Sequence, residues 1–213
     1  MTKYLIIDTE TTNTLDDPFY YDLGFAVVDT DGKVYEVGSF VNADIFLDTE
    51  MMSTAYFVDK VPMYWAEIKA GKRKLARHNT IRKAVHDVMK RHNIKAVVAH
   101  NARFDYRSTN YTQRLLTSSK YRYFFPYDCA ILDTLKMSRS VFGKDEAYKA
   151  FCEAHDYKCK NGTPRFTAEV IYRFLTDNEF VEEHTALEDV LIEKEIFAEC
   201  LRRDPSINGK LWG

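Results

Sequence analysis

The sequence lacks the cysteine patterns of a disulfide-stabilised or zinc-binding protein. Zinc sites and disulfide frameworks depend on repeated cysteine spacings, of which the Cys-x-x-Cys pair is the commonest. The 213 residues contain four scattered cysteines and no such pair. We therefore expect reduced, partly buried thiols at Cys129, Cys152, Cys159 and Cys200.

Long apolar runs are also missing. No stretch approaches the roughly 20 apolar residues that a bilayer-spanning helix needs. The composition, 46% hydrophobic and 29% charged, is ordinary for a soluble globular protein. The first apolar run begins at Lys3, which leaves no room for a signal peptide after Met1. The sequence predicts a cytoplasmic protein without membrane contact, and it shows no internal repeat or low-complexity segment.

The chain has no excess of positive charge, since its net charge is −2. That value does not indicate a nucleic-acid-binding protein. The charges are nevertheless unevenly placed, with a basic block over residues 69–83 and an acidic block over residues 179–189. Such blocks are usually exposed surface. If the acidic residues hold metal ions, however, the basic block becomes a candidate path for a polyanionic substrate.

Three apolar segments near the start predict an antiparallel meander. They cover residues 3–7, 23–28 and 34–41, and the last two flank the turn sequence Asp-Thr-Asp-Gly at residues 29–32.

The remainder of the chain alternates helices with strands. Apolar residues at helical spacing predict a helix over residues 80–92 with Asn79 as its N-cap, and a strand follows over residues 94–99. A strand after a helix predicts a parallel crossover. Further helices are expected near residues 48–57, from Pro62, and at 106–116, 133–141, 146–155, 167–175 and 186–201, with a strand at 127–132. This order predicts a mixed α/β sheet covered by helices, in one domain over residues 1–213.

Two carboxylates stand where the first apolar run ends. Asp8 and Glu10 are two residues apart, so in a strand they project from the same face. Carboxylates this close repel each other unless a cation lies between them. Oxygen ligands of this type favour Mg²⁺ or Mn²⁺. Taken alone, the pair is equally compatible with a strand that runs into an acidic turn.

Asp105 follows the strand at residues 94–99, within the sequence Asn-Ala-Arg-Phe-Asp. Ligands of open α/β sheets lie beyond the carboxyl ends of the strands, so Asp105 is expected to approach Asp8 and Glu10. By itself this motif is weak, because an aspartate in a first helical turn commonly serves only the helix dipole.

The last helix begins at a second weak motif. Thr185 and Glu188 have the spacing of a capping box, which makes Thr185 the N-cap and leaves His184 just before the helix. Asp189 then lies in the first turn, where the helix dipole favours an ionised carboxylate. A histidine before a helix is commonplace, so the weight of this motif comes from its place after the other two.

In this order, the motifs D-x-E, N-x-x-F-D and H-x-A-x-x-D resemble those of the DEDDh (DnaQ-like) 3′-to-5′ exonucleases. That family includes polymerase proofreading subunits, oligoribonuclease and ribonuclease T. The resemblance extends from Tyr4 to about Leu201. It implies a ribonuclease H-like fold and release of 5′-mononucleotides from nucleic-acid 3′ ends. The chain departs from compact members between Cys152 and His184, which predicts a loop-helix elaboration at residues 157–180.

The resemblance also implies a role for each site residue. Asp8, Glu10 and Asp189 would hold one Mg²⁺ or Mn²⁺, and Asp8 would bridge to a second, which Asp105 would support. His184 would be the general base. Contacts to the substrate are expected from Thr9, Thr11, Asn101 and Phe104.

The substrate and the partners stay open at this stage. A single-stranded or frayed DNA 3′ end is favoured, with RNA as the close alternative because no residue decides the sugar. A non-catalytic nucleic-acid-binding module on the same fold is less favoured, since all five site residues are present. A haloacid-dehalogenase-type phosphatase would need D-x-D where this chain has Asp8-Thr9-Glu10. No polymerase region fits in 213 residues, so a proofreading role would require a separate polymerase chain.

Overall fold

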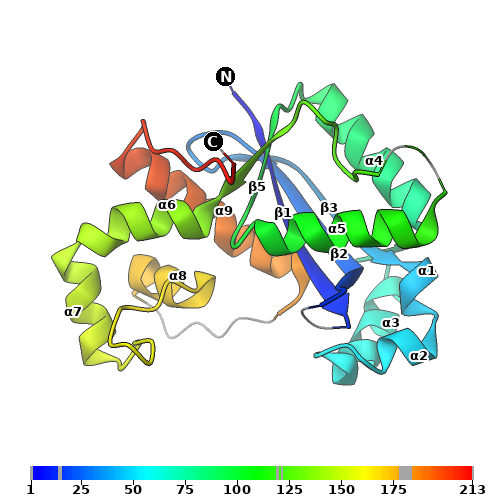
Figure 1. The fold of residues 1–213 in the computed structure, drawn as a ribbon, viewed down its shortest axis with the longest axis horizontal. Coiled ribbons are helices and arrows are strands. Elements are labelled where there is room, and N and C mark those ends of the chain that lie inside the picture. The colour runs from blue at the N-terminus through cyan, green and yellow to red at the C-terminus, as the bar shows by residue number, and fades with distance from the viewer. Residues whose placement is uncertain (1, 14–15, 119, 121, 178–183, 213) are drawn as a thin grey trace.

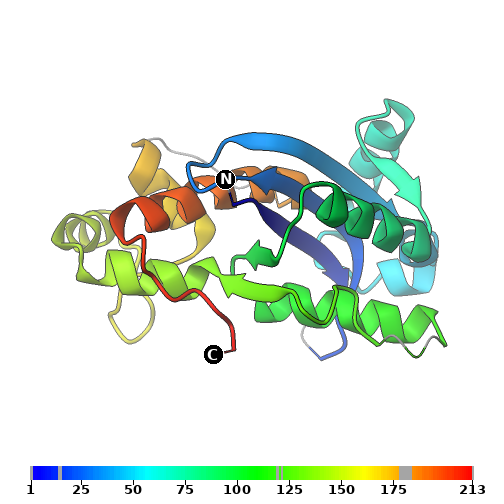
Figure 2. The same ribbon diagram turned by 90° about the horizontal axis from the view of Figure 1, so that it is seen from above.

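The computed structural model describes residues 2–13, 16–118, 120, 122–177 and 184–212. The described strands form one mixed six-stranded sheet in the order β4-β3-β2-β1-β5-β6. Helices cover both of its faces (Figures 1 and 2). The strands are β1 (Tyr4–Thr12), β2 (Phe19–Val28), β3 (Val34–Asn42), β4 (Lys74–Ala76), β5 (Ala96–Ala99) and β6 (Ala130–Asp133). The ribonuclease H-like mixed α/β fold expected from the sequence is confirmed.

The topology joins a meander to parallel strands. β1, β2 and β3 pair antiparallel in sequence order, and β5 then pairs parallel to β1 on its other side. β6 lies parallel to β5, and β4 lies parallel to β3. The strand β4 was not expected, because Lys74-Leu75-Ala76 is short and lies inside the basic block. β1 is therefore central, with a neighbour on each side.

Most helices lie at the expected positions, but the helix expected near residues 48–57 covers only residues 49–52, and a helix at residues 43–46 was not expected. Asn79 is not the N-cap of α4, however; that position is taken by Arg77, and the His78 N–H donates to Asp44 Oδ2 at 2.8 Å. The described helices are α1 (Ala43–Phe46), α2 (Thr49–Met52), η1 (Val58–Lys60), α3 (Val61–Lys69), α4 (His78–Arg91), α5 (Arg103–Leu116), α6 (Thr134–Val141), η2 (Phe142–Lys144), α7 (Glu146–Ala154), α8 (Ala168–Thr176) and α9 (Ala186–Arg203).

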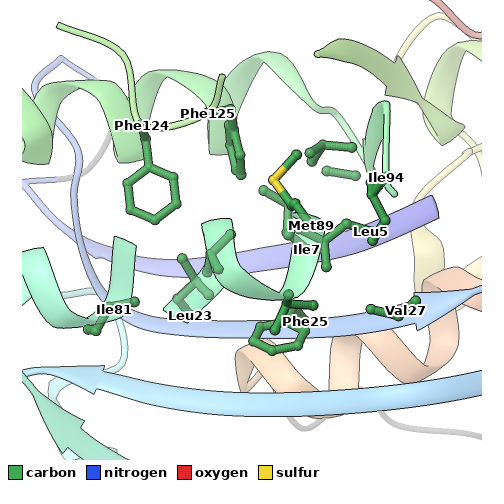
Figure 3. Packing of buried hydrophobic residues seen from close by; sticks show 14 of the residues in the cluster. Leu5, Ile7, Leu23, Phe25, Val27, Ile81, Met89, Ile94, Phe124 and Phe125 are labelled. Carbon is green, nitrogen blue, oxygen red and sulfur yellow. The ribbon is translucent and has the colours of Figure 1, made fainter. Parts of the chain in front are cut away.

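Alternation along β1 divides the core between the two faces of the sheet. Leu5 and Ile7 point into a cluster with side chains of α4 and the 124–125 segment (Figure 3). Ile6 points to the opposite face, where it joins a second cluster with α9. Asp8 and Glu10 keep the same alternation as Ile6 and so project on the α9 side.

The expected elaboration at residues 157–180 contains a short bridge and a helix. Lys158 and Pro164 pair antiparallel around Gly162, which has the positive φ of 81° that a tight turn requires. α8 follows, and residues 178–180 lie outside the described residues. So do residues 179, 182 and 183 of the acidic block.

Two other expectations from composition can be compared with the structure. All four cysteines are free thiols, two of them buried and Cys159 exposed. Among the described residues, none of the helices combines the length and apolar character needed to cross a membrane.

Candidate active site

Three carboxylates meet on the α9 face of the sheet. Asp8 and Glu10 extend from β1, and Asp189 extends from the first turn of α9. Their ligand oxygens all lie within 4.8 Å of one another. Three carboxylates at this spacing form a set of hard oxygen donors that fits a divalent cation such as Mg²⁺ or Mn²⁺. The structure thus brings together the three residues that the resemblance implied as ligands of one ion.

β1 continues past the positions expected from its apolar run. It extends to Thr12, so Asp8 and Glu10 lie inside the strand rather than just after it. Antiparallel pairing with β2 holds both residues in place, whereas the parallel pairing with β5 stops at Ile6–Val98. Asp8 therefore lies beyond the last parallel pair, at an edge that a neighbouring side chain or a ligand can approach.

Gly24 allows α9 to approach the strand that faces Asp8. It is the β2 partner of Asp8 in the antiparallel ladder. A Cβ at this position would lie 2.3 Å from the carbonyl carbon and oxygen of Ala186 at the start of α9. Only glycine fits here without a shift of the helix, and that close contact brings Asp189 to the carboxylates of β1. The sequence analysis gave Gly24 no role beyond its strand.

The start of α9 is fixed by a buried polar network. The Ala186 N–H donates to Asp22 Oδ2 at 3.1 Å, and the same oxygen accepts from the Tyr64 hydroxyl at 2.8 Å. Arg73 pairs with that oxygen at 2.9 Å, and with Glu188 Oε2 at 2.9 Å. Asp22, rather than a residue of α9, thus satisfies the first backbone N–H of the helix.

This network corrects two expectations. Thr185 is the N-cap of α9, but its hydroxyl contacts the Glu188 carboxylate and makes no side-chain cap hydrogen bond. The expected capping box is therefore replaced by the contact with Asp22. Arg73 belongs to the basic block proposed for the substrate path, yet it is only 4% exposed and is held by carboxylates. Its role is to anchor α9.

Asp105 approaches from the first turn of α5 and is also buried. Its Oδ1 accepts from the Thr9 hydroxyl at 2.9 Å, and Thr9 in turn contacts the Ser108 hydroxyl at 2.9 Å. The charge of Asp105 contributes to the raised pKa of Asp8, so the two groups are electrostatic neighbours. Thr9 was expected to contact substrate, but its side chain is 4% exposed and instead positions Asp105.

Burial raises the pKa values of the carboxyls in the site, and mutual repulsion adds to this rise at Asp8 and Glu10. Burial is the main cause at each site. The pKa of Glu10 rises to about 9, with Asp189 as the next cause, and the pKa of Asp105 rises to about 7. The pKa of Asp8 is raised as well, by burial and then by Asp105 and Glu193. In the absence of a cation, these carboxyls therefore bind protons at a higher pH than isolated carboxyls do, and a bound cation would lower their pKa values again.

Glu193 is a fifth carboxylate that the sequence analysis did not identify. It is 2% exposed, lies one helical turn after Asp189, and its Oε1 accepts from the His100 N–H at 3.1 Å. It thus connects α9 to the end of β5. The signal available in the sequence was the i, i+4 spacing from Asp189, which places both side chains on one face of the helix.

His184 lies just before α9, as expected, but it is not one of the three clustered ligands. Its backbone is left-handed, with φ of 49°, and its ring stacks on Phe57 at a centroid distance of 4.8 Å. The Lys60 ammonium donates to its carbonyl at 3.2 Å. Burial and then Lys60 lower the pKa of His184, which favours the neutral imidazole that can accept a proton.

A cavity of about 590 Å³ opens beside Asp8. Asn101 lines it and is exposed, with φ of 62° and its N–H bound to Asp133 Oδ1 at 3.1 Å. Thr11 is half-buried on β1, past the irregular register at Glu10, and Phe104 is half-buried in the first turn of α5. The other lining residues are His100, Leu135, Arg139, Cys159, Arg165, Phe166, Thr167, Ala168 and Glu193.

No protein-family model and no curated protein matches the chain. Solved structures do. Exonuclease I of E. coli in complex with a dT13 oligonucleotide is 16% identical, with a TM-score of 0.58 over 96% of this chain and 42% of its own. The structure of the same enzyme in complex with a 5cy-dT13 oligonucleotide is 15% identical, with a TM-score of 0.60 over 96% of this chain and 41% of its own.

A moderately thermophilic Exonuclease I from Methylocaldum szegediense is 15% identical, with a TM-score of 0.58 over 97% of this chain and 42% of its own. The chain thus spans about two fifths of the Exonuclease I chains that it resembles. At these identities the likeness establishes the fold.

Proposed function

We propose that residues 1–213 form one domain that hydrolyses phosphodiester bonds at nucleic-acid 3′ ends in the presence of divalent cations and releases 5′-mononucleotides. The observation that carries this proposal is the meeting of Asp8, Glu10 and Asp189 within 4.8 Å at the centre of a fold shared with Exonuclease I. DNA is the favoured substrate, because the similar Exonuclease I structures hold dT13 oligonucleotides.

The donor set supports a metal requirement. Asp8, Glu10 and Asp189 would hold one Mg²⁺ or Mn²⁺, and Asp105, which is an electrostatic neighbour of Asp8, would support a second. Two such ions stabilise the charge that develops on the attacking and leaving oxygens of a phosphodiester displacement. The protein's contribution is a buried, preorganised set of carboxylates whose raised pKa values fall when positive charge arrives.

His184 is proposed to accept the proton of the attacking water. Its lowered pKa leaves the imidazole neutral near pH 7, ready to take a proton. Its position outside α9, on left-handed backbone, separates it from the rigid helix. The ring now stacks on Phe57, so in this proposal it leaves that contact when substrate enters.

The cavity beside Asp8 is the proposed place for the terminal nucleotide. It is lined by the carboxylates of Asp8 and Glu193 and, among others, by the guanidinium groups of Arg139 and Arg165. This distribution suits a phosphodiester, because the cations can bind non-bridging oxygens while the carboxylates hold metal. Asn101, at the same cavity, is the remaining substrate contact that this geometry favours.

End-labelled oligonucleotides test the activity and its direction. With Mn²⁺, a 5′-labelled single strand should yield a descending ladder, whereas a 3′-labelled strand should release labelled mononucleotide from the first time point. Matched DNA, RNA and duplex substrates rank the preferred polymer. Binding without cleavage at any metal concentration would favour the non-catalytic module instead. The association with a separate polymerase chain stays a prediction. Testing it would require a polymerase to be added to these assays.

A further inference from the structure

The outward face of α5 carries a row of three arginines with a tyrosine among them. Arg103, Arg107, Tyr111 and Arg114 are three or four residues apart, which places them along one side of the helix. Asp105 is the only acidic residue in α5, and it is buried. The exposed charges of this helix are therefore all positive, in a chain whose net charge is −2.

A row of aromatic rings runs beside these cations. Trp212 contacts Tyr106 at a centroid distance of 4.7 Å, and Tyr106 lies 6.4 Å from Tyr123. Tyr127 follows, 6.5 Å from Tyr123. Tyr127 is 94% exposed and Trp212 is 53% exposed, so these rings are not explained by the hydrophobic core. Large apolar groups left in water commonly mark a binding surface.

The two rows form one surface. The Arg114 guanidinium lies 6.0 Å from the centre of the Tyr123 ring and 5.9 Å from that of Tyr111. Arg107 lies 5.4 Å from the Tyr111 ring. Among the described residues, no carboxylate forms a salt bridge with Arg103 or Arg114. The connection to β6 adds the exposed cation Arg122.

We propose that this surface binds the single-stranded nucleic acid that leads to the 3′ end in the candidate active site. We name it the α5 track and define it by Arg103, Arg107, Tyr111, Arg114, Tyr123 and Tyr127. Basic side chains beside aromatic rings are the arrangement that binds single strands, because the cations follow the phosphates and the rings stack on unpaired bases. The inference rests on the proposed function for the direction of the strand.

The position of α5 supports this strand path. Asp105 lies in its first turn, so the helix begins at the candidate site, and α5 lies at the outside of the fold in front of the sheet (Figure 1). On this outer face the Arg107 guanidinium also donates to the Asp16 carbonyl at 3.1 Å. From Arg103 to Arg114 the helix rises roughly 16 Å, enough to contact several phosphates of one strand. A strand that leaves the site at the start of α5 would reach the three arginines in order.

Binding without metal tests the α5 track directly. Fluorescence anisotropy with labelled dT20 in EDTA gives the affinity at several salt concentrations for the wild type and for Arg103→Gln/Arg107→Gln/Arg114→Gln. Each phosphate contact to a single strand contributes about 0.7 to the slope of log affinity against log salt, so the slope should become shallower by about 2. Between 50 and 200 mM salt, the variant should then lose roughly 18-fold less affinity than the wild type.

A charge-matched control removes three exposed lysines outside both α5 and the basic block: Lys33→Gln/Lys90→Gln/Lys144→Gln. This control should keep the wild-type salt slope. An equal change of slope in both triple variants, or no change in either, would overturn the track.

Tyr127→Ala tests the stacking half of the proposal. Because Tyr127 is 94% exposed, its removal leaves the core intact. Stacking on an unpaired base predicts roughly 5- to 150-fold weaker binding of dT20, with the affinity for a blunt duplex unchanged. An equal loss for both probes would overturn stacking on single strands.

The α5 track and the nuclease can fail separately. Protein that binds dT20 with the expected slope but never cleaves it overturns the proposed function and keeps the binding surface. Protein that cleaves dT20 while the arginine variant keeps the wild-type slope overturns the track alone.

Discussion

Replacing Asp105 by asparagine should stabilise the metal-free protein at pH 8 and leave its stability near pH 4 almost unchanged. Asparagine keeps the shape of the side chain and an oxygen that can accept from the Thr9 hydroxyl, which now lies 2.9 Å from Asp105 Oδ1. It removes the negative charge from a side chain that is 2% exposed and that neighbours Asp8. The substitution therefore isolates the cost of the buried charge.

The magnitude follows from the pKa of Asp105. Burial raises this pKa from 3.8 to about 7, so between these values the folded protein retains a proton that the unfolded chain releases. The contribution of Asp105 to the free energy of unfolding is therefore most favourable below pH 3.8, falls as the pH rises through this range, and is least favourable above pH 7. The full rise corresponds to about 4 kcal/mol, which is the most that Asp105→Asn can add at pH 8.

Urea denaturation in EDTA at pH 4, 6 and 8 measures this difference. For a chain of this length, a gain of about 4 kcal/mol would also raise Tm by roughly 8 to 16 °C. Saturating Mn²⁺ should reduce or reverse the advantage of the variant, because the cation binds the wild-type carboxylates and stabilises the folded state. A difference that is the same at pH 4 and pH 8, or a variant less stable than the wild type at pH 8 in EDTA, would refute the reasoning.

Three further predictions concern the parts that support the site. Gly24→Ala should separate α9 from β2, because the added Cβ would lie 2.3 Å from Ala186, and should weaken the Mn²⁺-dependent increase in Tm as well as basal stability. Gly143→Ala, whose added Cβ would make only an ordinary contact of 3.8 Å with Phe166, is the control for that measurement, and equal metal responses would contradict it. Asp8→Asn should abolish oligonucleotide cleavage while the protein stays folded by circular dichroism; retained cleavage would exclude Asp8 as a ligand. His184→Asn should lower kcat by roughly 10²- to 10⁴-fold and remove the acidic limb of the pH-rate profile; an unchanged limb would assign the proton transfer to another group.

The order of the elements could be predicted because local patterns determine it. The apolar runs at residues 3–7, 23–28 and 34–41, together with the turn at residues 29–32, indicate the meander, and helical spacing indicates α4. β4 could not be predicted in this way. Its three residues form a strand only because β3 offers a free edge, which is a tertiary cause without a local signal.

The metal-ligand candidates could be predicted from the sequence, but the contacts that hold them in place could not. The spacing of Asp8 and Glu10, and the place of Asp189 in a first turn, are properties of single elements. The contact of Gly24 with α9 is different, because it depends on a packing distance between elements far apart in sequence. The same holds for Asp22, which satisfies the start of a helix 164 residues later. Thr9 was expected to contact the substrate for the same reason. The sequence around Thr9 gives no sign that its hydroxyl donates to Asp105 in α5.

Calorimetric titration of metal-free protein with Mn²⁺, run in parallel with cleavage of a 5′-labelled single-stranded oligonucleotide, tests the central claim most directly. The account predicts that wild-type protein binds the cation, releases protons at pH 7 because the carboxyls of Glu10 and Asp105 ionise, and cleaves from the 3′ end over the same range of metal concentration. Asp8→Asn should lose both signals. Cleavage that persists in EDTA, or Mn²⁺ binding that is unaffected by Asp8→Asn, would contradict a metal-dependent nuclease built on this carboxylate cluster.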